Sequence, residues 1–194
     1  PEVVWIGTGE DQGGRHFGYG DGIYKSLDGG KNWTNMGLKN SERISKIVIH
    51  PKNSNIVWVA VQGPLWSSGG QRGLYKTVDG GKNWKLVLKD NKWTGATEVI
   101  LDHSNNKVMY AALWQRHRTV AASMGGGPGS GIYKSYDEGE TWKKLTNGLP
   151  KSNMGKIGLD ISRQNNDILY AAIELNRRTG GVYRSDDQGA NWKK

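Results

Sequence analysis

The chain has 194 residues, with 27 Lys and Arg against 18 Asp and Glu, which gives a formal net charge of +9. It contains no cysteine, so disulfides, thiolate metal sites and cysteine nucleophiles are excluded. No stretch reaches the ~18 consecutive apolar residues of a transmembrane helix. The positive charge favours an acidic partner, whereas the plainer interpretation is a lysine-rich surface that keeps the chain in solution.

The composition predicts many short strands joined by tight turns. Gly occurs 29 times, Trp 9 times and Tyr 8 times, against a single Phe. Glycine supports tight turns, and large amphipathic rings suit a half-buried sheet surface. Apolar runs and turn signals then recur in a fixed order along the chain. The predicted strands are, in chain order, 3–7 and 22–25; 44–50, 56–61 and 73–76; 96–102, 108–113 and 131–134; and 156–162, 168–173 and 181–184. A last strand is predicted to start at the Trp that follows the turn of each unit.

A motif of the form S/T-x-D-x-G-x-T/N-W follows each Gly-aliphatic-Tyr-basic strand. Its four aspartates lie 51, 58 and 50 residues apart, which is the period of a β-propeller blade. Four equivalent carboxylates in four equivalent turns do not converge on one substrate, so we expect them to cap their turns. The ligand spacing of a calcium loop is missing. The motif positions are Asp28, Gly30 and Trp33; Asp79, Gly81 and Trp84; Asp137, Gly139 and Trp142; and Asp187, Gly189 and Trp192.

The predicted fold is an all-β propeller segment of about four four-stranded blades with Asp-box hairpins, incomplete at both ends. The predicted blades span residues 1–42, 43–94, 95–154 and 155–194. The first lacks its first strand, and the last stops just after its Trp. Because an open array leaves unpaired edges and uncovered apolar faces, we expect further blades of the same polypeptide, or a partner chain, at the ends. The start at Pro1, on a strand and without a signal-peptide pattern, favours a fragment of a larger propeller protein.

The four motifs in register identify the Asp-box, or BNR, repeat. It is shared by sialidases, xyloglucanase-type glycoside hydrolases, sortilin-type Vps10 domains and photosystem II assembly factors. The amino-acid sequence at residues 6–10, 19–26, 36–38 and 49–51 most resembles that of large exported bacterial sortilin-like BNR-repeat proteins. That resemblance implies a ligand-binding propeller of a secreted, periplasmic or cell-surface protein.

The predicted binding face is formed by the loops between the second and third strands of each blade. These loops, 9–21, 62–72, 114–130 and 174–180, are the least repetitive part of the chain, and Trp93 lies on a link at the same face. Aromatic rings offer flat surfaces to a sugar or a peptide side chain, and arginines grip carboxylate, sulfate or phosphate. The alternative is that these side chains pack or solvate the loops. The candidate ligand-binding residues are Arg15, His16, Tyr19, Trp66, Arg72, Trp114, Arg116, His117, Arg118, Arg177 and Arg178.

The sequence supports three functions. The preferred one is a non-catalytic propeller that binds a glycan or protein, with an anionic ligand favoured by the charge and no specific nucleic-acid partner. The first alternative is part of a glycoside hydrolase, for which Glu10 and Glu174 are the weak catalytic candidates, since both end a second strand. The second alternative is a scaffold in a multiprotein assembly. The histidines lack the spacing of metal ligands, so no metal is expected. The glycine-rich segment 125–129 lacks the Lys-Ser/Thr of a phosphate-binding loop, so no cofactor is expected and the segment is interpreted as a flexible lid or spacer.

Overall fold

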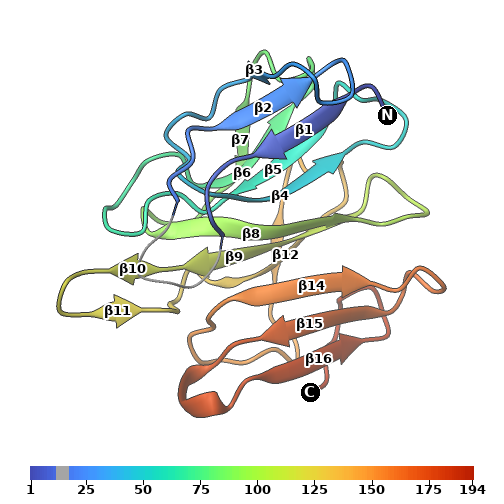
Figure 1. Ribbon diagram of the computed structural model, residues 1–194. Helices are drawn as coiled ribbons and strands as arrows, with labels where there is room; N and C mark the ends of the chain where they lie inside the picture. Colours follow the sequence, from blue (N-terminus) through green and yellow to red (C-terminus); the bar gives the residue numbers. More distant parts are fainter. Residues whose placement is uncertain (12–17) are drawn as a thin grey trace.

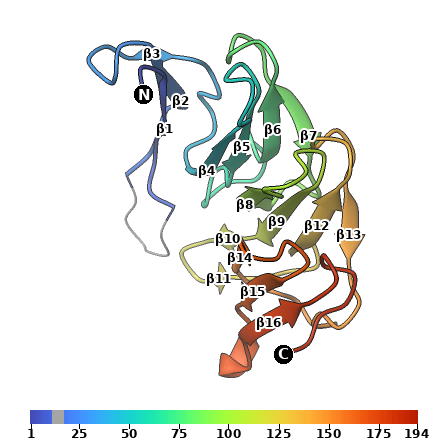
Figure 2. The same ribbon diagram turned by 90° about the vertical axis from the view of Figure 1, so that its right-hand side faces the viewer.

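The computed structural model describes residues 1–11 and 18–194, and the chain folds as a succession of small antiparallel sheets (Figure 1). Blade 1 contains β1 (Val4–Gly7), β2 (Ile23–Ser26) and β3 (Thr34–Asn35). Blade 2 contains β4 (Ile44–Ile49), β5 (Val57–Val61), β6 (Gly73–Thr77) and β7 (Lys85–Leu88). Figure 2 shows these blades following one another around an arc.

Blades 3 and 4 continue the pattern. Blade 3 contains β8 (Thr94–Leu101), β9 (Met109–Gln115), β12 (Gly131–Ser135) and β13 (Lys143–Leu145). Between β9 and β12 the chain forms a two-stranded hairpin, β10 (His117–Arg118) and β11 (Ser123–Met124). Blade 4 contains β14 (Ile157–Ile161), β15 (Leu169–Ile173) and β16 (Gly181–Ser185), with a 3-10 turn, η1 (Asn176–Arg178), before β16. The predicted all-β class and strand order are confirmed; η1 is a short helical element that the sequence patterns did not predict.

The hydrophobic core lies between consecutive blades. One cluster joins blades 1 and 2 through Trp5, Ile23 and Tyr75. The next joins blades 2 and 3 around Trp58, and the last joins blades 3 and 4 around Tyr110. Each blade therefore buries one of its faces only when a neighbour covers it, as expected for a stacked repeat protein.

The Asp-box hairpins form closed hydrogen-bond networks within their own turns. In the first box, Asp28 Oδ1 accepts the backbone N–H of Lys31 at 3.0 Å and of Asn32 at 2.9 Å. The Ser26 hydroxyl donates to the same oxygen at 2.7 Å and accepts the Gly30 N–H at 2.8 Å. The other three boxes repeat this arrangement. The box carboxylates are thus engaged in satisfying turn donors.

This bonding lowers the pKa of the box aspartates and predicts a loss of stability in acid. The pKa of Asp28 and of Asp79 falls to about 2, first through the backbone N–H four residues later. The pKa of Asp187 also falls to about 2, mainly through the asparagine amide four residues later. Burial of Asp137 acts in the opposite direction, but hydrogen bonds led by the threonine hydroxyl four residues later overcome it and leave its pKa at about 2.

A carboxylate whose pKa is lower in the folded state stabilises the fold above its unfolded pKa, and that contribution is lost as the pH falls through the folded value. We therefore expect the free energy of unfolding to decline between about pH 4 and pH 2. Urea titrations at pH 7, 5, 4, 3 and 2 measure this decline. The Asp28→Asn variant removes one titrating group and should show a shallower decline; an unchanged slope in that variant would contradict the assignment.

Candidate functional site

The irregular loops between second and third strands lie on one side of the array, away from the Asp-box hairpins. Figure 1 shows β10–β11 and η1 on this side, which we call the loop face. The long insertion of blade 3 crosses toward blade 2: the Arg116 N–H donates to the Trp93 carbonyl at 3.1 Å, and the Arg118 N–H donates to the Leu65 carbonyl at 3.1 Å. Backbone bonds, rather than a shared sheet, therefore fix the β10–β11 hairpin on its neighbour.

This docking brings three candidate ligand-binding residues together with Trp93, the tryptophan on the link at the same face. We call this group the tryptophan shelf: Trp66, Trp93, His117 and Arg118. The rings of Trp93 and His117 have centroids 4.1 Å apart. The Arg118 guanidinium lies 5.8 Å from the Trp66 ring centre, and Trp66 remains 40 % exposed. An exposed indole with a cation near its ring offers a flat apolar surface with a polar border.

Arg72 and Trp114 lie beneath the surface of the loop face. The Arg72 guanidinium donates to the carbonyls of Gly69, Gln62, Pro64 and Ser67 and is only 7 % exposed. The Trp114 indole is also 7 % exposed and donates to the Gly125 carbonyl at 2.9 Å. The sequence interpretation placed both among surface ligand residues, but their polar groups are used to hold the loops together, because a buried donor needs an internal acceptor.

Arg116 joins a cationic group at the base of the loops. Its guanidinium carbon lies 4.6 Å from the Trp114 ring centre. Burial, together with the neighbouring charges of Arg43 and Arg118, lowers the pKa of Arg116 to about 10 against the opposing effect of nearby carboxylates. Arg43, which directly precedes β4, is 1 % exposed and pairs with Glu42 at 3.0 Å. In the described residues, positive charge is therefore concentrated at the inner end of the loop face, around Arg43 and Arg116.

A second feature of the loop face is a hollow of about 650 Å³ between blades 3 and 4. We call it the Glu174 hollow. Glu174, Arg177 and Arg178 line it together with backbone of Gly125, Gly126 and Gly180. Arg177 and Arg178 both adopt left-handed backbone conformations, with φ of 54° and 58°. Non-glycine residues rarely do so, and such strain concentrates at functional sites.

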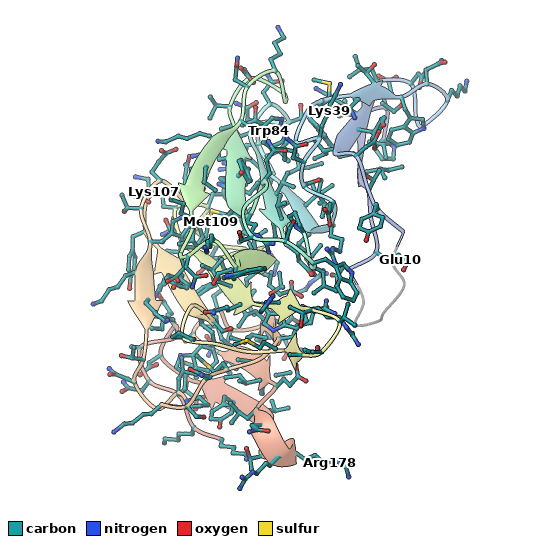
Figure 3. All side chains as sticks on the ribbon, turned by 90° about the vertical axis from the view of Figure 1, so that its left-hand side faces the viewer. Glu10, Lys39, Trp84, Lys107, Met109 and Arg178 are labelled. Atoms are coloured by element: carbon teal, nitrogen blue, oxygen red, sulfur yellow. The ribbon has the colours of Figure 1, made fainter. Side chains whose placement is uncertain are left out.

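The predicted arginines are thus divided between two places. His117 and Arg118 belong to the tryptophan shelf and directly follow Arg116, whereas Arg177 and Arg178 line the Glu174 hollow. Figure 3 shows Arg178 at one end of the array, away from Glu10. Tyr19 is 66 % exposed. Arg15 and His16 lie outside the described residues. The glycine-rich segment is hydrogen-bonded to blade 3, since Gly129 N–H donates to the Gln115 side chain at 2.9 Å.

Glu174 takes part in a charged chain that crosses between blades 1 and 4. Lys156 Nζ lies 2.6 Å from Asp11 Oδ1, and the Lys156 backbone N–H donates to Glu174 Oε2 at 3.2 Å. Asp11 follows Glu10 directly. The loop that follows β1 of blade 1 is therefore linked through Lys156 to the end of β15 in blade 4. The two catalytic candidates from the sequence are therefore connected through the neighbour of Glu10.

Glu98 is an acid that the sequence patterns did not single out. It lies on β8 beside a bulge, and its Oε2 is 3.5 Å from Lys46 Nζ on the adjacent first strand of blade 2. Burial raises the pKa of Glu98, with Lys46 and Lys156 opposing and Asp11 adding to the rise. A half-buried acid with a raised pKa beside other charges is a candidate proton donor. The signal available in the sequence was a Lys and a Glu at equivalent positions of two strands that are otherwise uncharged.

Neither a metal cluster nor a membrane helix stands out in the described chain. Among residues 1–11 and 18–194, no group of three His, Asp or Glu side chains is arranged to hold a metal ion. Over the same residues, no helix has the length and apolar character needed to cross a membrane.

Comparison with known proteins places these observations in a family context. A family model described as BNR/Asp-box repeat matches residues 183–194, which include the fourth box. The chain carries BNR/Asp-box repeats. It is 27 % identical over 156 residues to a probable oligoxyloglucan-reducing end-specific xyloglucanase of Neosartorya fischeri, an alignment that covers 74 % of this chain and 17 % of that protein.

Solved structures with the same fold include two GH74 enzymes. The enzyme of Niastella koreensis superposes with a TM-score of 0.71 at 20 % identity, over 99 % of this chain and 27 % of its own. The GH74 xyloglucanase of Xanthomonas campestris superposes with a TM-score of 0.68 at 17 % identity, over 98 % of this chain and 28 % of its own. This Asp-box chain is therefore a propeller segment that spans about a quarter of those enzymes and less of the fungal relative.

Proposed function

We propose that the chain is part of the substrate-binding propeller of a glycoside hydrolase, and that a xyloglucan-type polysaccharide is the first substrate to test. The observation that carries this proposal is the tryptophan shelf of the loop face, together with Glu174 in its hollow and Glu98 on β8. The exposed Trp66 ring, with the Arg118 guanidinium 5.8 Å from its centre, offers the kind of platform on which a sugar ring stacks. The names of the relatives direct the choice of substrate, by analogy.

Two acids linked through Lys156 supply the groups that glycoside hydrolysis requires: the charge of Lys156 acts on Glu98 of β8, and the Lys156 backbone N–H donates to Glu174 Oε2. A glycosidase pairs one protonated carboxylic acid with one carboxylate across the scissile bond. Glu98, with its raised pKa, suits the acid, and Glu174, at the edge of the hollow, suits the carboxylate. This pairing replaces Glu10 by Glu98 as the preferred partner of Glu174. The proposal also places the protein outside the cell, because a polysaccharide substrate such as xyloglucan does not cross membranes.

Binding and turnover are tested separately on the chain and its variants. Isothermal titration with xyloglucan oligosaccharides should show binding that weakens by about five- to thirtyfold in Trp66→Ala, since one stacked ring contributes roughly 1–2 kcal/mol. Val120→Ala, a change at a residue 91 % exposed on the loop between β10 and β11, is the matched control. Unchanged binding in Trp66→Ala would contradict the shelf as a sugar platform.

Reducing-end release from xyloglucan distinguishes an enzyme from a binder. Release that is lost in Glu98→Gln and Glu174→Gln but kept in Glu10→Gln supports the acid pair. Binding without release in every variant favours instead the non-catalytic recognition propeller suggested by the sortilin-type resemblance.

A further inference from the structure

A small enclosed pocket at the inner end of the loop face is lined by three arginines, Arg43, Arg72 and Arg116. We call it the arginine pocket. Arg43 directly precedes β4, Arg72 ends the loop before β6, and Arg116 follows β9, so the three cations come from separate segments of blades 2 and 3. The volume of the pocket, about 10 Å³, is that of a site for one water-sized body.

The other walls of the arginine pocket are neutral. The remaining lining residues carry no charge: Gln62, Gly63, Pro64, Leu65 and Trp114. No Asp or Glu lines the pocket among the described residues, and residues 12–17, which the structure does not describe, contain neither in the sequence. A negative charge inside the pocket therefore has to come from a bound species.

Arg72 offers a donor to such a species. Its guanidinium donates to four backbone carbonyls, once through Nε, once through Nη1 and twice through Nη2. A guanidinium has five N–H groups, so one N–H on Nη1 remains. The other N–H of Nη1 donates to the Gln62 carbonyl at 3.0 Å, and Gln62 itself lines the pocket. A buried charged donor is therefore available to an acceptor within the pocket.

The three cations also repel one another. Burial is the main cause of the lowered pKa of Arg72 and of Arg116, and the charge of Arg43 is the next cause in both. Nearby carboxylates oppose these shifts. One of them, Glu42, lies 3.0 Å from Arg43, but its side chain is 29 % exposed and does not line the pocket. Because charges interact more strongly away from water, an anion among the three guanidinium groups would offset this repulsion.

We infer that the arginine pocket binds a single halide-sized anion, such as chloride. A chloride ion is only slightly larger than a water molecule, whereas sulfate and phosphate are too large for the pocket. The anion accepts from Arg72 Nη1 and joins the loop before β6 to the insertion of blade 3. The Arg116 backbone N–H donates to the carbonyl of Trp93 in the tryptophan shelf, so the bound anion holds the loops that support the shelf. This site is independent of whether the chain acts on a polysaccharide.

Chloride binding is tested by thermal unfolding in mixtures of sodium chloride and sodium gluconate at one ionic strength of about 0.2 M, which keeps the screening of surface charges constant. Gluconate is too large to enter the pocket. A ligand that binds only the folded state stabilises it by mass action. For a dissociation constant of about 10 mM, the melting temperature should rise saturably by about 4–7 °C as chloride replaces gluconate. Bromide should have the same effect as chloride.

A pair of variants makes the result specific. Arg116→Gln removes one of the three charges and should raise the dissociation constant for chloride by at least about tenfold. Arg163→Gln, the same change at an exposed arginine in the turn before β15, is the matched control and should leave that constant unchanged. The readout is the dependence on chloride, so a variant that is merely less stable does not imitate the loss of the site.

Crystals grown in sodium bromide locate the ion directly. An anomalous scattering peak is expected among the guanidinium groups of Arg43, Arg72 and Arg116. Equal melting temperatures in chloride and gluconate would overturn the inference. A chloride effect that Arg116→Gln leaves intact, or bromide found only at the protein surface, would overturn it as well, because either result would indicate a general salt effect.

Discussion

The Trp58→Ala variant is expected to lose about 3–5 kcal/mol of unfolding free energy, the usual cost of truncating a buried aromatic residue. Trp58 is fully buried between blades 2 and 3 and takes part in several interactions. Its indole donates to the Glu138 carbonyl at 3.1 Å, the Lys76 ammonium lies 5.4 Å from its ring centre, and its ring packs on Gly139. The substitution leaves a cavity and weakens the junction of two blades.

Tyr170→Ala is the matched control, because Tyr170 holds the same position in blade 4. Since the ring is 40 % exposed and no described residue of a following blade covers it, the change should cost less than about 1 kcal/mol. Urea unfolding followed by circular dichroism measures both variants. Equal losses would contradict the view that the core lies between blades, since the two residues differ mainly in whether a neighbour covers them.

Arg72→Ala should destabilise the protein by about 2–4 kcal/mol, the second-largest effect that we expect from a single change. The side chain is buried and donates to four carbonyls of the loop that precedes β6. Removing it leaves several buried acceptors without a donor, and each costs about 1–3 kcal/mol before the loop relaxes toward water. Burial already lowers the pKa of Arg72 to about 10, which reflects the cost of holding its charge there.

Arg72→Lys should recover only a small part of this loss, because an ammonium cannot reach the carbonyls that the planar guanidinium bridges. Arg178→Ala, on the exposed rim of the Glu174 hollow, is the comparison and should change stability by less than about 0.5 kcal/mol. Urea titration gives the stabilities, and hydrogen exchange of residues 62–72 reports the loop. A fully stable Arg72→Ala variant would return Arg72 to the candidate ligand residues.

The repeat made most of the fold predictable. The predicted strands end within about two residues of the observed ends, because alternating apolar runs and box turns are local signals that recur four times. The exceptions are the parts that do not repeat. The β10–β11 hairpin and η1 lie in loops whose conformation depends on contacts with other blades, such as the Arg118 backbone bond to Leu65.

The candidate site was predicted only in outline. Residue type drew attention to loops rich in arginine and tryptophan, but it could not distinguish Arg72, which is buried and donates to four carbonyls, from Arg178, which is exposed. It also passed over Glu98, because a single acid in an apolar strand is significant only when the strand is known to lie beside Lys46. Whether such a side chain is buried, and which residues it contacts, depends on how the blades pack together, so neither could be predicted from the sequence.

The sequence by itself determined the architecture: four Asp-box units, their strand order and the turns that join them, since these depend on local hydrogen bonding and on a period of apolar residues. Only the tertiary structure decided which charged and aromatic side chains are structural and which reach the surface. The reason is that each blade is completed by its neighbour, so the burial of Trp58, the carbonyl partner of Lys76, 62 residues away, and the exposure of Tyr170 follow from stacking between segments far apart in the sequence.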